Sequence, residues 1–186
     1  MKINQNLFRA QTNLNKAFEE IFKGLTNRDG LIRRQILGGR INFSARTVIV
    51  PNAKLKAYQI ELPYVAFVEM FKKQIINVLV KMQGCSYSEA RNQWQRGYKA
   101  FDKKIYGVIK YILKNSKTPV KILLNRNPTI NFGSFMVMDI KKVKKDYTDL
   151  STGLPIASLQ SLNADFDGDV LNIIELVSEE FKKEFG

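Results

Sequence analysis

A run of helical periodicity stands between two groups of strand-like segments, and this order limits the possible folds more than any other feature of the chain. Helical signals fill residues 63–118. Apolar, β-branched segments of strand length lie on both sides of it, at residues 41–44, 47–50, 120–124, 134–138 and 170–174. The simplest arrangement is a β structure interrupted by a helical insertion, which predicts the α+β fold class.

Local start and stop signals divide the helical block into three expected helices. Pro63 suits the first position of a helix, and Gly84 suits the position after its end. Ser86 and Glu89 have the spacing of a capping box, which predicts the start of a second helix. A third helix is expected over residues 101–113.

The N-terminal segment over residues 6–25 predicts an amphipathic helix. Its apolar side chains recur at helical spacing, and polar residues fill the other face. The apolar stripe consists of Leu14, Phe18, Ile21, Phe22 and Leu25. We expect this stripe to pack against a partner that need not belong to this chain.

The chain is strongly basic. Of its 186 residues, 30 are Lys or Arg and 17 are Asp or Glu, which gives a net charge of +13. This excess favours a polyanionic partner, with nucleic acid the first expectation and an anionic membrane the second. The most apolar stretch is interrupted by charged residues, so we expect no membrane span.

Two residue types exclude whole classes of site within this chain. Histidine is absent and Cys85 is the only cysteine. A histidine-based catalytic triad, a histidine-ligated metal, an intrachain disulfide and a cysteine-rich zinc site are therefore excluded. A single thiol is typical of a reducing compartment.

The sharpest local feature is the acidic segment at residues 163–169, in which Asp165, Asp167 and Asp169 alternate. In a straight strand these carboxylates would be too far apart to share one ion. Around a tight turn, which Gly168 permits, they can converge on a hard cation such as Mg²⁺. Carboxylate-held magnesium in a basic protein indicates phosphoryl or nucleotidyl transfer.

Three other interpretations of this segment are an EF-hand, a phosphatase motif and a surface turn. A calcium-binding EF-hand needs Gly and Glu at loop positions that Val170 and Leu176 occupy here, so it fails. A phosphatase of the haloacid-dehalogenase type carries a similar run, but places it at the start of a long domain. An acidic surface turn without a ligand is the third alternative.

Three blocks together resemble the largest subunit of multisubunit DNA-dependent RNA polymerases, which is called beta-prime in bacteria. Residues 33–49 resemble its switch-2 region and first barrel strands, and residues 124–129 resemble its Asn-Arg-x-Pro-Thr motif. Residues 163–169 match its Asn-Ala-Asp-Phe-Asp-Gly-Asp loop at all seven positions. The blocks occur in the family's order, and the resemblance extends over about residues 14–176.

The resemblance implies a fold and a domain organisation. The fold would be a double-psi β-barrel with inserted helices and an N-terminal helix. Residues 1–27 would form a helical arm, residues 28–178 the barrel with its insertion at about 63–118, and residues 179–186 a C-terminal tail.

The resemblance also implies roles for particular residues in template-directed RNA synthesis. Catalytic Mg²⁺ would be held by Asp165, Asp167 and Asp169. Asn163 and Arg126 would contact the ribose of the incoming nucleoside triphosphate, and Pro128 would shape that pocket. The template strand and the RNA–DNA hybrid would be held by Arg28, Arg33, Arg40 and Arg46, since arginine grips phosphates bidentately.

Departures from the family's pattern occur beside two of the motifs. Residues 130–133 and 170–173 replace the usual family residues, and many residues are Asn, Lys or Ile. These features predict a divergent enzyme, encoded by a large bacteriophage. A complete largest subunit is far longer, so the chain is expected to be an excised domain or one piece of a split subunit.

The resemblance implies an enzyme that works only as an assembly. The chain would be inactive alone and would need the second-largest (beta-like) subunit and the remaining largest-subunit segments, acting in the cytoplasm at the nucleoid. Two alternatives stay open: a nucleic-acid-binding scaffold fragment without catalysis, and a fragment of a two-barrel RNA polymerase of the RNA-silencing type. The block at residues 40–49 argues against the latter.

Overall fold

The computed structural model describes residues 2–27, 29–36, 38–39, 41–116, 118–130, 132–178 and 180–181. The chain divides into two compact units, residues 1–41 and residues 42–186. The boundary expected from the sequence lay earlier, between residues 27 and 28, and most of the expected tail at 179–186 falls outside the described residues.

The first unit contains one long helix, α1 (Lys2–Thr26), followed by a short π-helical turn, η1 (Ile32–Ile36). The amphipathic pattern of the sequence is present on α1, but its apolar side chains are exposed. Phe18 and Phe22 stack on each other with ring centroids 6.0 Å apart, yet Phe18 remains 66% exposed. Among the described residues of this unit, the apolar stripe thus stays largely uncovered.

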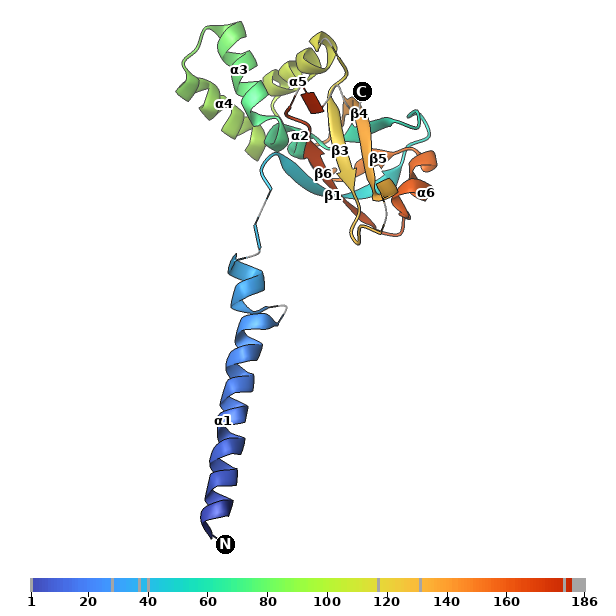
Figure 1. Cartoon of the computed structure of the whole chain (residues 1–186). Coiled ribbons are helices and arrows are strands. Elements are labelled where there is room, and N and C mark those ends of the chain that lie inside the picture. The colour runs from blue at the N-terminus through green and yellow to red at the C-terminus, as the bar shows by residue number, and fades with distance from the viewer. Residues whose placement is uncertain are drawn as a thin grey trace. The chain divides into compact units, whose positions relative to one another are not determined.

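The second unit is built on a closed six-stranded barrel (Figure 1). Its strands are β1 (Ser44–Pro51), β2 (Gln59–Leu62), β3 (Lys121–Asn125), β4 (Phe135–Val143), β5 (Thr152–Leu154) and β6 (Val170–Glu175). They follow one another around the barrel in the order β1, β5, β2, β4, β3, β6.

The barrel mixes parallel and antiparallel neighbours. The pairs β1–β5 and β2–β4 are parallel, and the other four pairs are antiparallel. Parallel neighbours need long crossover connections, which the helices and loops between these strands supply. The α+β fold class with a closed barrel, expected from the sequence, is confirmed, and it is consistent with the double-psi β-barrel.

Two strands of the barrel were absent from the sequence prediction. β2 has only four residues and β5 only three, with the sequences Gln-Ile-Glu-Leu and Thr-Gly-Leu. Such short segments carry too few residues for a period of two to be recognised. Closure of the barrel depends on both strands, since β5 lies between β1 and β2.

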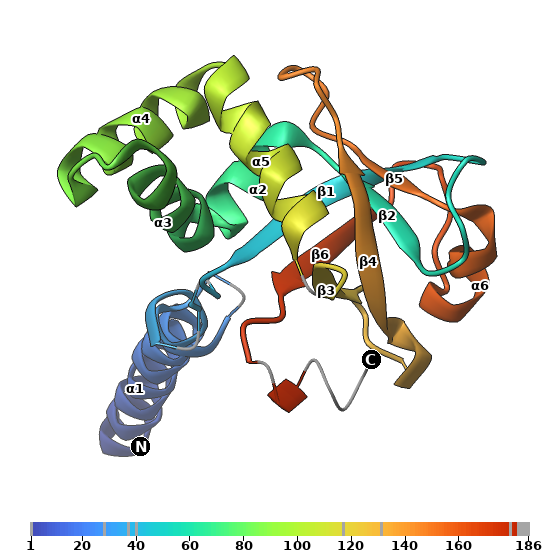
Figure 2. The same cartoon turned by 90° about the horizontal axis from the view of Figure 1, so that it is seen from above.

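The helical insertion comprises α2 (Tyr64–Met70), α3 (Lys72–Gln83), α4 (Tyr87–Lys99) and α5 (Lys103–Asn115). The single helix expected between Pro63 and Gly84 is broken at Phe71, whose backbone (φ −94°, ψ 25°) ends α2 and begins α3. The capping box at Ser86 is present, with both reciprocal hydrogen bonds to Glu89. Figure 2 shows α5 lying against the barrel, while α3 and α4 stand farther out.

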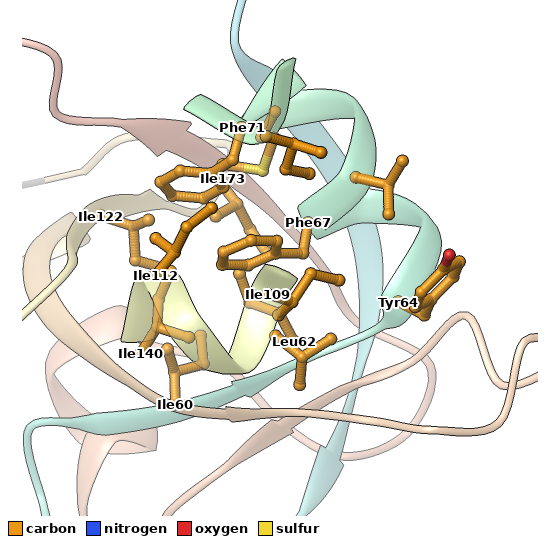
Figure 3. Close-up of a cluster of buried hydrophobic side chains, with 14 of the residues drawn as sticks. Ile60, Leu62, Tyr64, Phe67, Phe71, Ile109, Ile112, Ile122, Ile140 and Ile173 are labelled. Atoms are coloured by element: carbon orange, nitrogen blue, oxygen red, sulfur yellow. The ribbon is translucent and has the colours of Figure 1, made fainter. Parts of the chain in front are cut away.

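One hydrophobic core joins the insertion to the barrel (Figure 3). Phe67 and Phe71 stack with ring centroids 4.3 Å apart, and Ile109 of α5 lies beside them. The barrel contributes Ile60, Leu62, Ile122, Ile140 and Ile173 to the same cluster. Burial of this apolar area is the main stabilising contribution, so α2 and α5 are integral to the barrel.

The last connection before β6 leads into the acidic segment. It contains a 3₁₀ turn, η3 (Ile156–Ser158), and the short helix α6 (Leu159–Leu162), while another 3₁₀ turn, η2 (Phe132–Ser134), precedes β4. Among the described residues, no helix has the length and apolarity needed to cross a membrane.

Candidate functional site

The barrel topology brings two of the sequence motifs together. β3 and β6 are antiparallel neighbours, and Asn125 at the end of β3 pairs with Asn172 near the start of β6. Arg126 directly follows β3, and Asp169 directly precedes β6, so both residues lie at the same end of this strand pair. The backbone amide of Ile49 on β1 donates to the carbonyl oxygen of Asp169 at 3.1 Å and anchors the segment to a third strand.

The acidic segment is a tight loop whose turns occur at two residues with positive φ. Asn163 ends α6 in the left-handed conformation (φ 47°), which Asn tolerates better than most residues. Gly168 has φ 112°, where a side chain would be strained. The sequence predicted this turn at Gly168, and it places Asp169 so that its side chain returns toward the loop.

Asp169 is the most heavily bonded carboxylate of the loop. Arg126 donates to it bidentately, from Nε to Oδ2 at 2.9 Å and from Nη2 to Oδ1 at 3.2 Å. The backbone amide of Asp165 also donates to Oδ2, at 2.9 Å. The Arg126 guanidinium, followed by the Asp165 amide, lowers the pKa of the Asp169 carboxyl below its usual value, because both donors favour the charged form.

Asp165 and Asp167 are exposed to solvent. Asp165 accepts a hydrogen bond at Oδ1 from the backbone amide of Phe166 at 2.7 Å, which fixes the start of the turn. Within the part of the chain that the structure describes, no three acidic or cysteine side chains are close enough together to hold a metal ion.

The chemistry of the donor set nevertheless fits a hard divalent cation. Three carboxylates within five residues of one turn supply the oxygen ligands that Mg²⁺ prefers. Two of them face solvent, whereas Asp169 is engaged by Arg126. The residues therefore supply the type of ligand that Mg²⁺ prefers. Asp169 would have to release Arg126 in order to bind the cation.

The loop that follows β3 is ordered by its own polar side chains. Asn125 and Thr129 bond to each other, with Asn125 Nδ2 3.2 Å from Thr129 Oγ1. Ser134 accepts from the Ile130 amide through Oγ at 3.2 Å, and its carbonyl accepts from the Arg126 amide at 3.4 Å. Sequence reasoning missed the role of Ser134, which carries no signal beyond its position at the end of this loop.

The other expected nucleotide-binding residues lie on the two loops. Asn163 and Pro128 are both exposed, and the Asn127–Pro128 peptide bond is cis. Neither has a hydrogen bond to Arg126 or Asp169 among those found in the described residues.

The four arginines expected to hold nucleic acid lie in different parts of the chain. Arg46 is exposed on β1, where its register partner is Asn172 of β6, so it lies in one cross-strand row with Asn125. Arg33 is exposed on η1 in the first unit. Arg28 and Arg40 lie outside the described residues.

The family model and the individual relatives that match this chain all point to the same protein family. A family model described as RNA polymerase Rpb1, domain 2, matches residues 38–186. The DNA-directed RNA polymerase subunit beta' of Elusimicrobium minutum is 28% identical over 158 residues, which cover 85% of this chain and 10% of that protein. The subunit of the same name from Bifidobacterium animalis subsp. lactis is 30% identical over 169 residues, covering 91% of this chain and 12% of its own length.

A third relative, the beta' subunit of Mycoplasma pneumoniae, is 28% identical over 170 residues and is covered to 13% of its length. The chain thus spans about a tenth of the length of the curated relatives it matches. The matched residues include the barrel, the helical insertion and the acidic loop. The chain belongs to the RNA polymerase Rpb1 domain 2 family and corresponds to a segment of the largest, beta'-type subunit.

Proposed function

We propose that this chain is the catalytic barrel of a DNA-dependent RNA polymerase, in which residues 163–169 bind the Mg²⁺ used for RNA chain extension. The observation that carries the proposal is the meeting of Arg126 and Asp169 across β3 and β6. It brings two of the three motifs that resemble the polymerase motifs into one site, in a chain that belongs to the RNA polymerase Rpb1 domain 2 family.

In this proposal, Asp165, Asp167 and Asp169 hold the cation. When bound, Mg²⁺ supplies charge stabilisation to the attacking and leaving oxygens of an in-line displacement. Arg126 and Asn163 bind the ribose of the nucleoside triphosphate, where the 2′ hydroxyl distinguishes RNA precursors from DNA precursors. Arg126 is suited to this, since a guanidinium donates several hydrogen bonds in a fixed geometry.

Nucleic acid is held by charge. Arg28, Arg33, Arg40 and Arg46 contact phosphates of the template strand and the hybrid, in keeping with the net charge of +13. The position of Arg46 supports this role. Arg46 is exposed, and it lies in the same cross-strand row as Asn125, which directly precedes Arg126. Such contacts position the nucleic acid without reading its sequence.

The chain alone does not polymerise nucleotides in this proposal. The barrel of the second-largest subunit and the rest of the largest subunit complete the site, and the phage origin inferred from the sequence stays a prediction. A second candidate, a scaffold that binds nucleic acid without catalysis, is favoured by one observation: among the described residues, no three acidic side chains are close enough together to hold a cation.

The test is to purify the chain from its native cells and to identify the proteins that co-purify. We expect a beta-like polypeptide and further beta'-type segments, and we expect the assembly to extend an RNA primer on a DNA template with Mg²⁺. The pure chain, as the control, should not extend the primer. An assembly that contains the chain and extends normally after Asp167→Ala would contradict the catalytic role and leave the scaffold function.

A further inference from the structure

The Asp169 carboxylate has its oxygens occupied by donors of the chain itself. Oδ2 accepts from Arg126 Nε and from the Asp165 amide, each at 2.9 Å, and Oδ1 accepts from Arg126 Nη2 at 3.2 Å. The two side chains are only about one-fifth exposed, so water screens the pair less than it would at an open surface. Asp169 therefore differs from Asp165 and Asp167, which are exposed.

A cation and the guanidinium compete for this carboxylate. A cation bound to an Asp169 oxygen at about 2.1 Å would lie within about 5 Å of an Arg126 nitrogen that remained bonded to the same oxygen. Two positive groups at that distance repel each other. This repulsion favours an arrangement in which Arg126 moves away when the cation binds.

We propose that Arg126 is a counter-ion latch, which holds Asp169 in the cation-free loop and is released when the cation binds. The latch rests on the proposed function, which assigns both the cation and the ribose contact. It deepens that function because the released guanidinium becomes available to the nucleotide. Cation binding and nucleotide binding then favour the same released state, so each strengthens the other.

The latch also explains how three neighbouring carboxylates coexist without a cation. Arg126 neutralises one of the three charges, and the Asp165 amide fixes the neutralised carboxylate against the turn. The loop is thereby kept in its turn while Asp165 and Asp167 stay exposed to solvent.

The test measures binding of Mn²⁺, an oxygen-preferring probe for this type of site, to the full chain by electron paramagnetic resonance. Arg126→Gln should bind Mn²⁺ about fivefold more tightly than the parent, which corresponds to about 1 kcal/mol. Arg126→Lys keeps the charge but loses the bidentate fork, so it should also bind more tightly. Arg91→Gln, which makes the same charge change on α4, is the matched control and should leave the affinity unchanged.

Repeating the Arg126→Gln comparison in an Asp169→Asn chain separates the latch from simple charge repulsion. An Asp169→Asn chain keeps weaker Mn²⁺ binding through Asp165 and Asp167 but has no carboxylate for Arg126 to hold, so replacing Arg126 by Gln should no longer tighten that binding. A gain of equal size in that background would overturn the latch, since a cation repelled only through space would be relieved in both backgrounds. Unchanged binding in Arg126→Lys would overturn it as well.

A direct readout uses Mg²⁺ itself. The Arg126 Nε–H proton should exchange slowly with water in the cation-free chain and faster once Mg²⁺ is added, as followed by nuclear magnetic resonance of the labelled full chain. Protection that persists at saturating Mg²⁺ would overturn the release.

Failure of the latch and failure of the proposed function give different results. If the parent binds Mn²⁺, Asp167→Asn weakens that binding and the Arg126 variants bind like the parent, the metal site stands and the latch is overturned. If the parent binds no Mn²⁺, or Asp167→Asn binds as well as the parent, the magnesium assignment is overturned together with the latch.

Discussion

Two parts of the second unit are built in opposite ways. One is the interface of α5 with the barrel, and the other is the acidic loop at residues 163–169. Ile109 and Ile112 of α5 are buried and lie beside barrel residues in the shared hydrophobic core. In the loop, Asp165 and Asp167 are exposed, and its polar contacts are hydrogen bonds and one ion pair, beside the partly buried Ala164 and Phe166.

The difference shows where stability and chemistry reside in this barrel. Apolar burial contributes about 25 cal/mol per Å², whereas partly exposed ion pairs contribute about 1 kcal/mol or less. Substitutions at the α5 interface should therefore change the free energy of unfolding strongly, and substitutions in the loop should change it little.

Ile109→Ala should destabilise the chain by about 2–5 kcal/mol, because it leaves a cavity between α5 and the barrel. Urea unfolding followed by the fluorescence of Trp94 measures this, since Trp94 is the only tryptophan and lies buried in the insertion. Tyr111→Ala, at an exposed position of the same helix, is the control and should cost far less. Equal losses at the two positions would show that α5 is not anchored through its buried face.

Tyr64 should make the core sensitive to alkaline pH. Burial raises the pKa of Tyr64 to about 12, because desolvation disfavours the phenolate. The folded state thus holds the proton more tightly than the unfolded chain, whose tyrosines titrate near pH 10. The associated stability is complete below pH 10 and is lost as the pH rises through 12, by up to about 2–3 kcal/mol.

The Tyr64 effect is measured as the difference between the parent and Tyr64→Phe in urea unfolding at several alkaline pH values. Subtraction removes the titration of lysines, which both chains share. Between pH 10 and 12 the parent should lose stability faster than the variant. Parallel curves would mean that the Tyr64 hydroxyl reaches water in the folded chain.

Sequence reasoning succeeded where a local signal decides the structure. Ser86 and Glu89 predicted a capping box that the structure contains, and periodicity predicted helices at both α1 and α5. Periodicity does not reveal what covers an apolar face, however. Ile109 is buried against the barrel, whereas Phe18 is exposed, although both belong to similar amphipathic patterns.

The sequence predictions failed where contacts between residues distant in the chain determine the structure. β2 and β5 are recognisable only from their neighbours in the barrel, and no local sequence signal predicted the break at Phe71, whose ring stacks on Phe67 in the core. At the site, the motifs predicted the residues but not the Arg126–Asp169 ion pair. That pair depends on the β3–β6 register, which the sequence does not specify.

Asp169→Ala should lower the free energy of unfolding by about 0.5–1 kcal/mol. The variant removes the acceptor of both Arg126 and the Asp165 amide. Arg126→Ala should cost a similar amount, and the double variant little more than either, because the three chains lose one shared interaction. Thermal melting without divalent cations checks this, and fully additive losses would contradict the pairing.

Asp167→Ala should have the smallest effect on stability and a large effect on function. The side chain is exposed, so melting of the cation-free chain should be unchanged or slightly raised, since one of three neighbouring negative charges is removed. In the assembled polymerase the same variant should abolish RNA synthesis while leaving assembly and DNA binding intact, because the proposed cation needs all three carboxylates. Run-off transcription measures this, with Asp146→Ala, an exposed carboxylate after β4, as the matched control. Normal transcription by Asp167→Ala would mean that the loop is a structural turn, and loss of transcription together with unfolding would mean that the loop contributes to stability as the α5 interface does.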